Sequence, residues 1–177
     1  MSTSKSALSI VFVRKVVRVV DSEIAIVLRK TSNKDERRKI IKGYLIEKLV
    51  GNTISKEYAD GHFEIRNNIS DTDHLTHNEH LDTSIALTQV EELIETSEYL
   101  GEKKVDLKNK PKSKNKYFWY FRTTVEIDGQ IYDYVLNIGQ SKTDGHISLY
   151  DITNYNKKNA DSYRVSSTGN IRSLRKI

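Results

Sequence analysis

The chain has 177 residues, of which 37% are hydrophobic and 30% charged, with one proline and no cysteine. This length fits one domain, or one domain with an extension. The missing cysteine excludes disulfide bonds, thiolate metal sites and thiol catalysis. No apolar run approaches the roughly 18 residues that a membrane helix needs, so no membrane span is expected.

The net charge of +5 hides an uneven distribution of charge along the chain. Residues 1–50 hold 12 lysines and arginines against 5 acidic residues, residues 51–100 hold 2 against 11, and residues 101–177 hold 15 against 8. A basic segment of this kind is typical of surfaces that bind phosphate backbones. It also occurs as a simple solubilising pattern, and charge alone does not separate the two.

The first elements in chain order are an apolar segment and a helix. Residues 8–28 are rich in valine and isoleucine, and they predict either two strands or two helices with a break at Asp21-Ser22. Thr31-Ser32-Asn33 then resembles a helix N-cap, with acidic residues in the first turn. Apolar residues follow at helical spacing, and Gly51 ends this helix.

The middle of the chain is polar. Residues 52–82 contain one short strand candidate, 62–65. The next helix is expected to have Asp82 or Thr83 as its N-cap and to run to about Thr96. A strand is predicted over 97–104. Residues 103–116 form a basic loop with seven lysines, and 146–153 form the last strand.

Residues 117–138 predict a β-hairpin around Asp128-Gly129. These two residues suit a type I′ turn, which needs positive φ at both central positions. Such a turn fixes the register, so Ile127 pairs with Gln130 and every side chain is assigned to one face. One face is a core of aromatic and aliphatic residues. The other carries Tyr120, Arg122, Thr124, Asp133 and Asn137.

These elements predict an α+β fold. A helix packs on an antiparallel sheet of about four strands, and the other face of the sheet stays free. Residues 1–60 are interpreted as an N-terminal helical or mixed extension, and residues 61–177 as the main domain.

The free face is the first candidate site, to which the last strand would add His146, Ser148 and Tyr150. An arginine on a rigid strand can hold a phosphate group, and tyrosines can stack on unpaired bases. The competing interpretation is purely structural, with Thr124 paired to Asp133 and Arg122 lying over Val135.

His74, His77 and His80 are the second candidate site. Their spacing could ligate zinc on a helix, but the HExxH pattern is absent and no cysteine helps, so no metal site is predicted. General acid–base chemistry suits histidine better, because its usual pKa lies near 6.5. An exposed polar loop explains them equally well. No nucleotide-binding glycine loop or nucleophile elbow is present, and no cofactor is predicted.

The run LTQVEELIETSEYLG, the lysine-rich loop, YFRTTVEIDGQIYDYVLNIG and HISLYDIT together resemble the barnase/EndoU/colicin/RelE-like (BECR) nuclease superfamily. The similarity covers residues 74–177 and is greatest to the nuclease-like domains of phage polyvalent proteins and polymorphic toxins. It implies a small, metal-independent ribonuclease. One departure concerns Ile152, because the phage relatives often carry a histidine at that position, after a Tyr-Asp pair.

The resemblance also implies residue roles. His74, His77 or His80 would act as acid or base, and Arg122 would stabilise the phosphorane. The site would be completed by His146, Ser148, Tyr150 or a serine at 166 or 167. RNA contacts are expected from Tyr120, Thr124, Asn137, Lys142, Ser148, Ser166 and Ser167.

The leading hypothesis is therefore an RNA endonuclease, with tRNA among its candidate substrates, in which the ribose 2′-OH attacks the adjacent phosphate. The alternatives are a catalytically inactive RNA-binding module and a protein-interaction domain that uses the acidic segment 51–100. A toxin role implies an immunity or antitoxin protein as partner, the cytoplasm as site of action and delivery into another cell. A histidine within one phosphate's reach of Arg122 would favour the enzyme.

Overall fold

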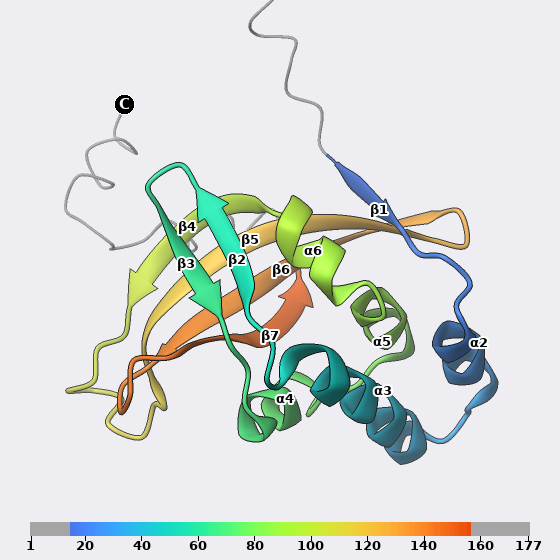
Figure 1. Cartoon of the computed structure of the whole chain (residues 1–177), viewed down its shortest axis with the longest axis horizontal. Coiled ribbons are helices and arrows are strands. Elements are labelled where there is room, and N and C mark those ends of the chain that lie inside the picture. The colour runs from blue at the N-terminus through green and yellow to red at the C-terminus, as the bar shows by residue number, and fades with distance from the viewer. Residues whose placement is uncertain (1–14, 157–177) are drawn as a thin grey trace, which may run out of the picture.

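The computed structural model describes residues 15–156, which form five helices, a five-stranded mixed sheet and a two-stranded sheet (Figure 1). The large sheet contains β1 (Val16–Arg18), β4 (Glu98–Lys104), β5 (Asn115–Ile127), β6 (Gln130–Ser141) and β7 (Ile147–Asn154). The small sheet pairs β2 (Ile54–Tyr58) with β3 (Gly61–Ile65). The helices are α2 (Glu23–Lys30), α3 (Lys34–Leu49), α4 (Ile69–Leu75), α5 (Leu81–Leu87) and α6 (Val90–Thr96). The predicted α+β class is confirmed.

The hairpin has the register that its turn predicts. Asp128 and Gly129 adopt φ angles of 52° and 79°, and Ile127 lies opposite Gln130. The alternation of faces therefore holds along both strands, from the turn to Trp119 opposite Ile138.

The large sheet has more strands than expected because one edge of β5 pairs with two strands, β4 and β1. β4 runs antiparallel along residues 117–122 of β5, and β1 runs parallel along residues 124–126. The opposite edge of β5 pairs with β6, which pairs with β7. The parallel strand β1 makes this a mixed sheet, whereas the sequence predicted an antiparallel one.

The N-terminal segment combines a strand and a helix. After β1, the Ser22 hydroxyl accepts a hydrogen bond from the Ala25 amide at 3.3 Å and caps α2. The break at Asp21-Ser22 is thus confirmed, but neither two strands nor two helices flank it. Residues 8–14 of this prediction lie outside the described residues.

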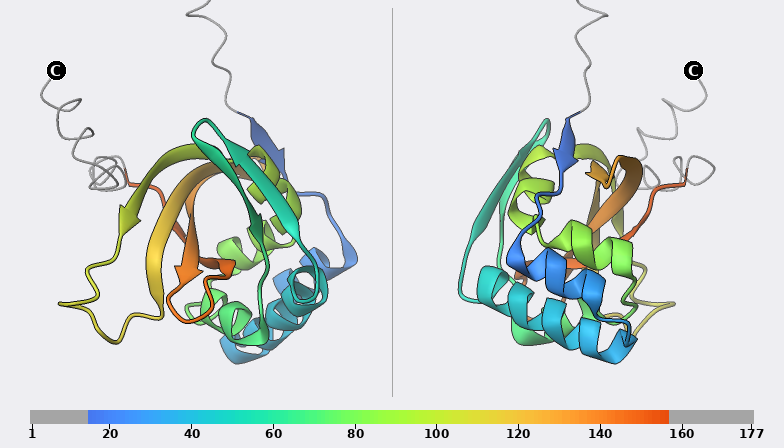
Figure 2. Two further views of the ribbon diagram at one scale, coloured as in Figure 1. Left: turned by 60° about the vertical axis from the view of Figure 1, so that its left-hand side comes forward. Right: turned by 90° about the vertical axis from the view of Figure 1, so that its right-hand side faces the viewer.

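One hydrophobic core lies between the large sheet and a layer made of the helices and the small sheet (Figure 2). Phe121, Leu136 and Leu149 point into it from the sheet, and Ile41 and Leu45 point into it from α3. The β2–β3 hairpin crosses position 60, so residues on both sides of the expected domain boundary belong to this core.

The helix expected from residue 82 or 83 to about 96 is two helices. The N-cap of α5 is His80, rather than Asp82 or Thr83, and the N-cap of α6 is Gln89. The Thr88 hydroxyl donates to the Ile85 carbonyl at 2.6 Å, and such a local bond competes with helix continuation.

The polar segment 52–82 also contains α4, which opens with a capping box. The Asn68 side chain accepts from the Asp71 amide, and the Asp71 carboxylate accepts from the Asn68 amide.

Candidate nucleic-acid interface

The face of the large sheet that points away from the core is called the open face below. Its side chains form rows across three strands. Tyr120 lies opposite Asn137, which lies opposite Asp151 on β7. In the next row Arg122 lies opposite Val135. The register shifts between β6 and β7 next to Asn137, and Tyr150 is left unpaired at that point.

One end of the open face is a closed polar network. The Arg122 guanidinium donates to one Asp133 carboxylate oxygen at 2.9 Å, and the Thr124 hydroxyl donates to the other at 2.6 Å. The Arg122 guanidinium carbon also lies 3.8 Å from the centre of the Tyr155 ring. The expected pairing of Thr124 with Asp133 is present, and the charge of Arg122 is already matched within the fold.

The other end, called the aromatic end, consists of Phe118, Tyr120, Tyr150 and His74. The His74 and Tyr150 rings are stacked, with centroids 3.8 Å apart and planes 17° from parallel. Phe118 lies 5.7 Å from Tyr150 and 6.3 Å from Tyr120. His74 reaches this end because α4 lies beside β7 at the edge of the sheet (Figure 1).

The electrostatic environment of His74 favours the neutral form of its imidazole. Burial lowers the pKa of His74 and outweighs the nearby Asp151 carboxylate, while the charges of His77 and Lys114 lower it further. Burial raises the pKa of Asp151. A neutral histidine whose pKa lies below its usual value can accept a proton at neutral pH.

The lysine-rich loop borders the aromatic end. The Lys142 amide donates to the Lys114 carbonyl at 3.0 Å, and the Lys142 ammonium donates to the Pro111 carbonyl at 2.6 Å. These bonds hold the β6–β7 connection against the loop that leads into β5. The exposed lysines 108, 110, 112 and 114 therefore lie next to the strand ends that carry Phe118 and Tyr150.

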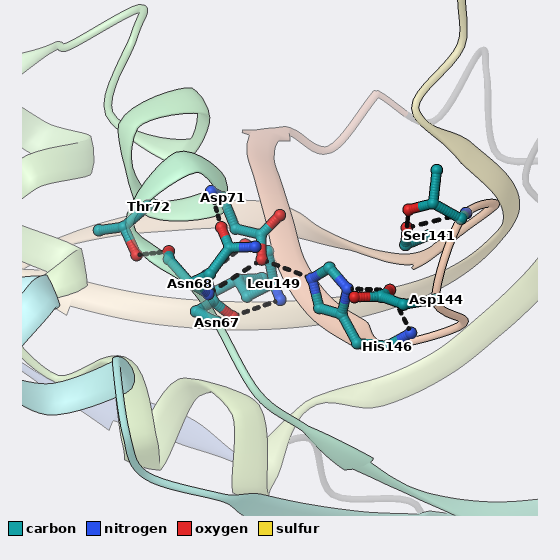
Figure 3. Close-up of polar contacts among 9 residues, drawn as sticks. Asn67, Asn68, Asp71, Thr72, Ser141, Asp144, His146 and Leu149 are labelled. Atoms are coloured by element: carbon teal, nitrogen blue, oxygen red, sulfur yellow. Dashed lines mark hydrogen bonds and ion pairs between the residues drawn. The ribbon is translucent and has the colours of Figure 1, made fainter.

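His146 has a different environment, between two carboxylates (Figure 3). Its Nε2 lies 2.8 Å from Asp71 Oδ2, and its Nδ1 lies 2.6 Å from Asp144 Oδ1. Burial lowers the pKa of His146, but the bonds to Asp144 and Asp71 outweigh burial and raise that pKa above its usual value. With both ring nitrogens engaged, His146 connects the start of β7 to α4.

The remaining predicted site residues are spread over the fold. His77 is exposed in the turn after α4, and His80 is exposed at the start of α5. Ser148 is buried opposite Gly139. Asn137 occupies the central row of the open face, where its Oδ1 is buried without a hydrogen-bond partner. Ser166 and Ser167 lie outside the described residues.

The structure brings His74 to the open face but not to Arg122. His74 stacks on Tyr150, and Arg122 stacks on Tyr155, five residues further along the chain. In an extended strand this separation is about 16 Å. One phosphate group would therefore touch both side chains only if they left these positions.

Sequence reasoning missed three contributors to the site: Phe118, Asp151 and Asp71. The hairpin register could have placed Phe118 on the open face, because it lies two residues before Tyr120 and alternate residues of a strand share a face. The position of Asp151 depends on the register shift in β7, and the contact of Asp71 with His146 joins residues 75 positions apart. Neither of these leaves a signal in the local sequence.

Among residues 15–156, no group of three histidine, aspartate or glutamate side chains is arranged to hold a metal ion. In the same part of the chain, no helix has the length and apolarity needed to cross a membrane.

The fold and the site define a mixed α+β domain with an open sheet face that is polar at one end and aromatic at the other. The chain belongs to the family described as large polyvalent protein-associated domain 3, which it matches over residues 32–155. No curated protein and no solved structure matches it. The family supports the polyvalent-protein type indicated by the sequence, while membership of the nuclease superfamily stays a prediction.

Proposed function

We propose that this domain binds single-stranded RNA across the aromatic end of the open face and the adjoining lysine-rich loop. The observation that carries the proposal is the position of Phe118, Tyr120 and Tyr150 together on a rigid sheet, beside exposed lysines. Proteins that bind single strands combine these two features, since aromatic rings stack on bases and lysines follow the phosphates.

The polar end of the face supports binding more than cleavage. Arg122 would have to leave Asp133 before it could stabilise charge on a phosphate. Separating this pair would leave the half-buried Asp133 carboxylate without its positively charged partner, which is costly. An RNA strand that avoids the polar end and follows the lysines leaves that network intact.

Binding is tested by titrating a labelled single-stranded RNA with the protein at several salt concentrations. Replacing Lys110, Lys112 and Lys114 by glutamine should weaken binding at least tenfold and reduce the salt slope by about 2, since each lost phosphate contact removes about 0.7 on single strands. The matched control replaces the exposed helix lysines 30, 34 and 39 in the same way. Equal losses in both triple variants would contradict the proposed surface.

The aromatic contribution is tested separately with Phe118→Leu, followed by circular dichroism to show that the fold is intact. We expect RNA affinity to fall roughly tenfold, because base–aromatic stacking contributes about 1–3 kcal/mol. The salt slope should not change, because no charge is removed. A Phe118→Leu protein with the affinity of the original chain would exclude stacking at this position.

RNA cleavage is the second candidate function, and the specific observation in its favour is the lowered pKa of His74 close to Lys114. His74 would accept the 2′-OH proton as the 2′ oxygen attacks phosphorus, and Lys114 would stabilise charge on the phosphate. The bond from phosphorus to the 5′ oxygen would break, and that oxygen would take a proton from water, which leaves a 2′,3′-cyclic phosphate. The assay is total tRNA in EDTA, with detection of 2′,3′-cyclic phosphate ends. Activity should rise with pH through a pKa below 6.5 and be lost in His74→Ala but not in His80→Ala. RNA retention without such products would leave binding as the function.

A further inference from the structure

A groove separates α2 from α3 and from the connection between α5 and α6, on the helical side of the molecule. Its volume is about 700 Å³. Apolar and aromatic side chains line it, namely Ile24, Val27, Ile40, Tyr44 and Val90. Val27 is 42% exposed, so apolar surface faces solvent here instead of packing in the core. Exposed apolar surface of this kind often marks an interaction site.

The rim of the groove is acidic. Glu23 lies at the start of α2, and Glu91 and Glu92 lie in the first turn of α6. Lys48 is the one basic residue among the lining residues, and its ammonium lies 5.7 Å from the centre of the Tyr44 ring. An apolar floor with an acidic rim repels nucleic acid and complements a segment that alternates apolar and basic residues.

Such a segment is present in this chain, at residues 170–177, with the sequence NIRSLRKI. Ile171, Leu174 and Ile177 recur every three residues, which is the spacing of one face of a helix. Arg172, Arg175 and Lys176 separate them and supply three positive charges. The apolar residues match the floor of the groove, and the basic residues match its rim.

The connection is long enough to reach. β7 ends beside α5, because Thr153 and Asn154 line a small cleft together with Thr83 and Ser84. α5 leads directly to Thr88, the first groove residue of that connection. Residues 157–169 can span about 45 Å when extended, and a domain of this size is about 40 Å across.

We propose that residues 170–177 bind in this groove of their own chain, with Leu174 against Val27 and Ile40 and with the arginines beside Glu91 and Glu92. The proposal is independent of RNA binding, because the groove lies on the helical side of the sheet and the RNA interface lies on the open face.

The test is site-specific photo-crosslinking in the full chain. A Val27→p-benzoylphenylalanine variant is irradiated, cleaved after acidic residues and mapped by mass spectrometry, so that the fragment 162–177 is recovered intact. We expect cross-links from position 27 to this fragment. The same photoreactive residue at Ile131, which is 54% exposed on β6, should give none.

Two further measurements make the outcome decisive. Leu174→Gln, and Glu91→Gln with Glu92→Gln, should each reduce the cross-link at least fivefold. The control pair Asp35→Asn with Glu36→Gln, also in the first turn of a helix, should not. Irradiating a mixture of light and heavy isotope-labelled chains distinguishes cross-links within one chain from cross-links between two chains. Light–heavy cross-links, cross-links to residues 1–14 or no cross-links to 162–177 would each overturn the proposal.

Discussion

Lys56 brings an ammonium group into the interior of the domain. Its side chain is only 4% exposed, and Nζ donates to the carbonyl oxygens of Glu95 at 3.2 Å and Ser97 at 2.7 Å. The ammonium also lies 5.0 Å from the centre of the Phe121 ring. These contacts connect β2 to the end of α6, and burial lowers the pKa of Lys56 to about 8.

A depressed lysine pKa predicts stability that rises with pH. Below pH 8 the residue is charged in both states, whereas between pH 8 and its ordinary pKa of 10.5 the folded protein loses the proton first. In this window the unfolded chain binds more protons, so the free energy of unfolding should increase by about 2 kcal/mol from pH 8 to pH 10.

Urea denaturation at pH 7, 8, 9 and 10 measures this contribution in the original protein and in Lys56→Met. The gain with pH should disappear in Lys56→Met and persist in Lys116→Met, which removes an exposed lysine. Parallel pH profiles for all three proteins would mean that Lys56 keeps an ordinary pKa.

At the residue scale, the sequence left two interpretations of Arg122, and the structure shows the internal pairing. The register placed Arg122, Thr124 and Asp133 on one face, and both a phosphate site and an internal pairing were consistent with that. Asp133 accepts from both partners. The carboxylate forms a charge-assisted hydrogen bond to the half-buried guanidinium, and such bonds are stronger than those between neutral groups.

At the scale of elements, turns and helices respond in opposite ways to the same substitution. Gly129 occupies the turn with φ +79°, a conformation that other residues rarely adopt. Gly43 lies within α3, where a methyl group would meet no atom within 4 Å. Glycine is therefore required at one position and is only a weak helix former at the other.

We predict that Gly129→Ala lowers the free energy of unfolding by about 1 kcal/mol, because alanine is strained at positive φ. Gly43→Ala should raise it by roughly 0.5–1 kcal/mol, because alanine favours the helix. Chemical denaturation of both variants provides the measurement, and each serves as the control for the other. If both substitutions raised the free energy of unfolding, the reduced entropy of the unfolded chain would outweigh strain at Gly129. If both lowered it, the helix preference of alanine would not decide the effect at Gly43.

α4 connects the candidate interface to the start of β7. It carries His74 to Tyr150, and its Asp71 is bound by His146 at the start of β7. Asn67, just before the helix, exchanges two hydrogen bonds of 2.9 Å with the backbone of Leu149. These contacts fix the histidine relative to the sheet by bonds between distant parts of the chain.

At the scale of the whole molecule, the segment before residue 32 belongs to the folded core, although the family match begins at that residue. Val17, Ala25 and Leu28 are each at most 1% exposed. β1 pairs with β5, and α2 packs against α3 and α5. Removing this segment would expose apolar residues of the remaining core.

Leu28→Ala should therefore lower the free energy of unfolding by about 2–5 kcal/mol, the usual cost of a core cavity. Ile26→Ala, which truncates a side chain that is 41% exposed on the same helix, should change it by about 0.5 kcal/mol or less. Urea denaturation of the two variants is the measurement. Small changes in both variants would mean that the segment before residue 32 contributes little to the stability of the core.

The sequence by itself determined what depends on neighbouring residues. The Asp128-Gly129 turn fixed the hairpin register, and with it the core face and the open face. The run Thr31-Ser32-Asn33 and Gly51 bounded α3, and Asn33 is the residue that caps it. The sequence also predicted the last strand to within one residue at each end.

The tertiary structure alone decided what depends on contacts between distant residues. The parallel strand β1, the stacking of His74 on Tyr150 and the separation of His74 from Arg122 arise from packing of segments far apart in the chain. Their energies come from burial and from hydrogen bonds that form only after the chain is folded. The chemistry that a face can perform depends on these contacts, because they determine which charges stay free.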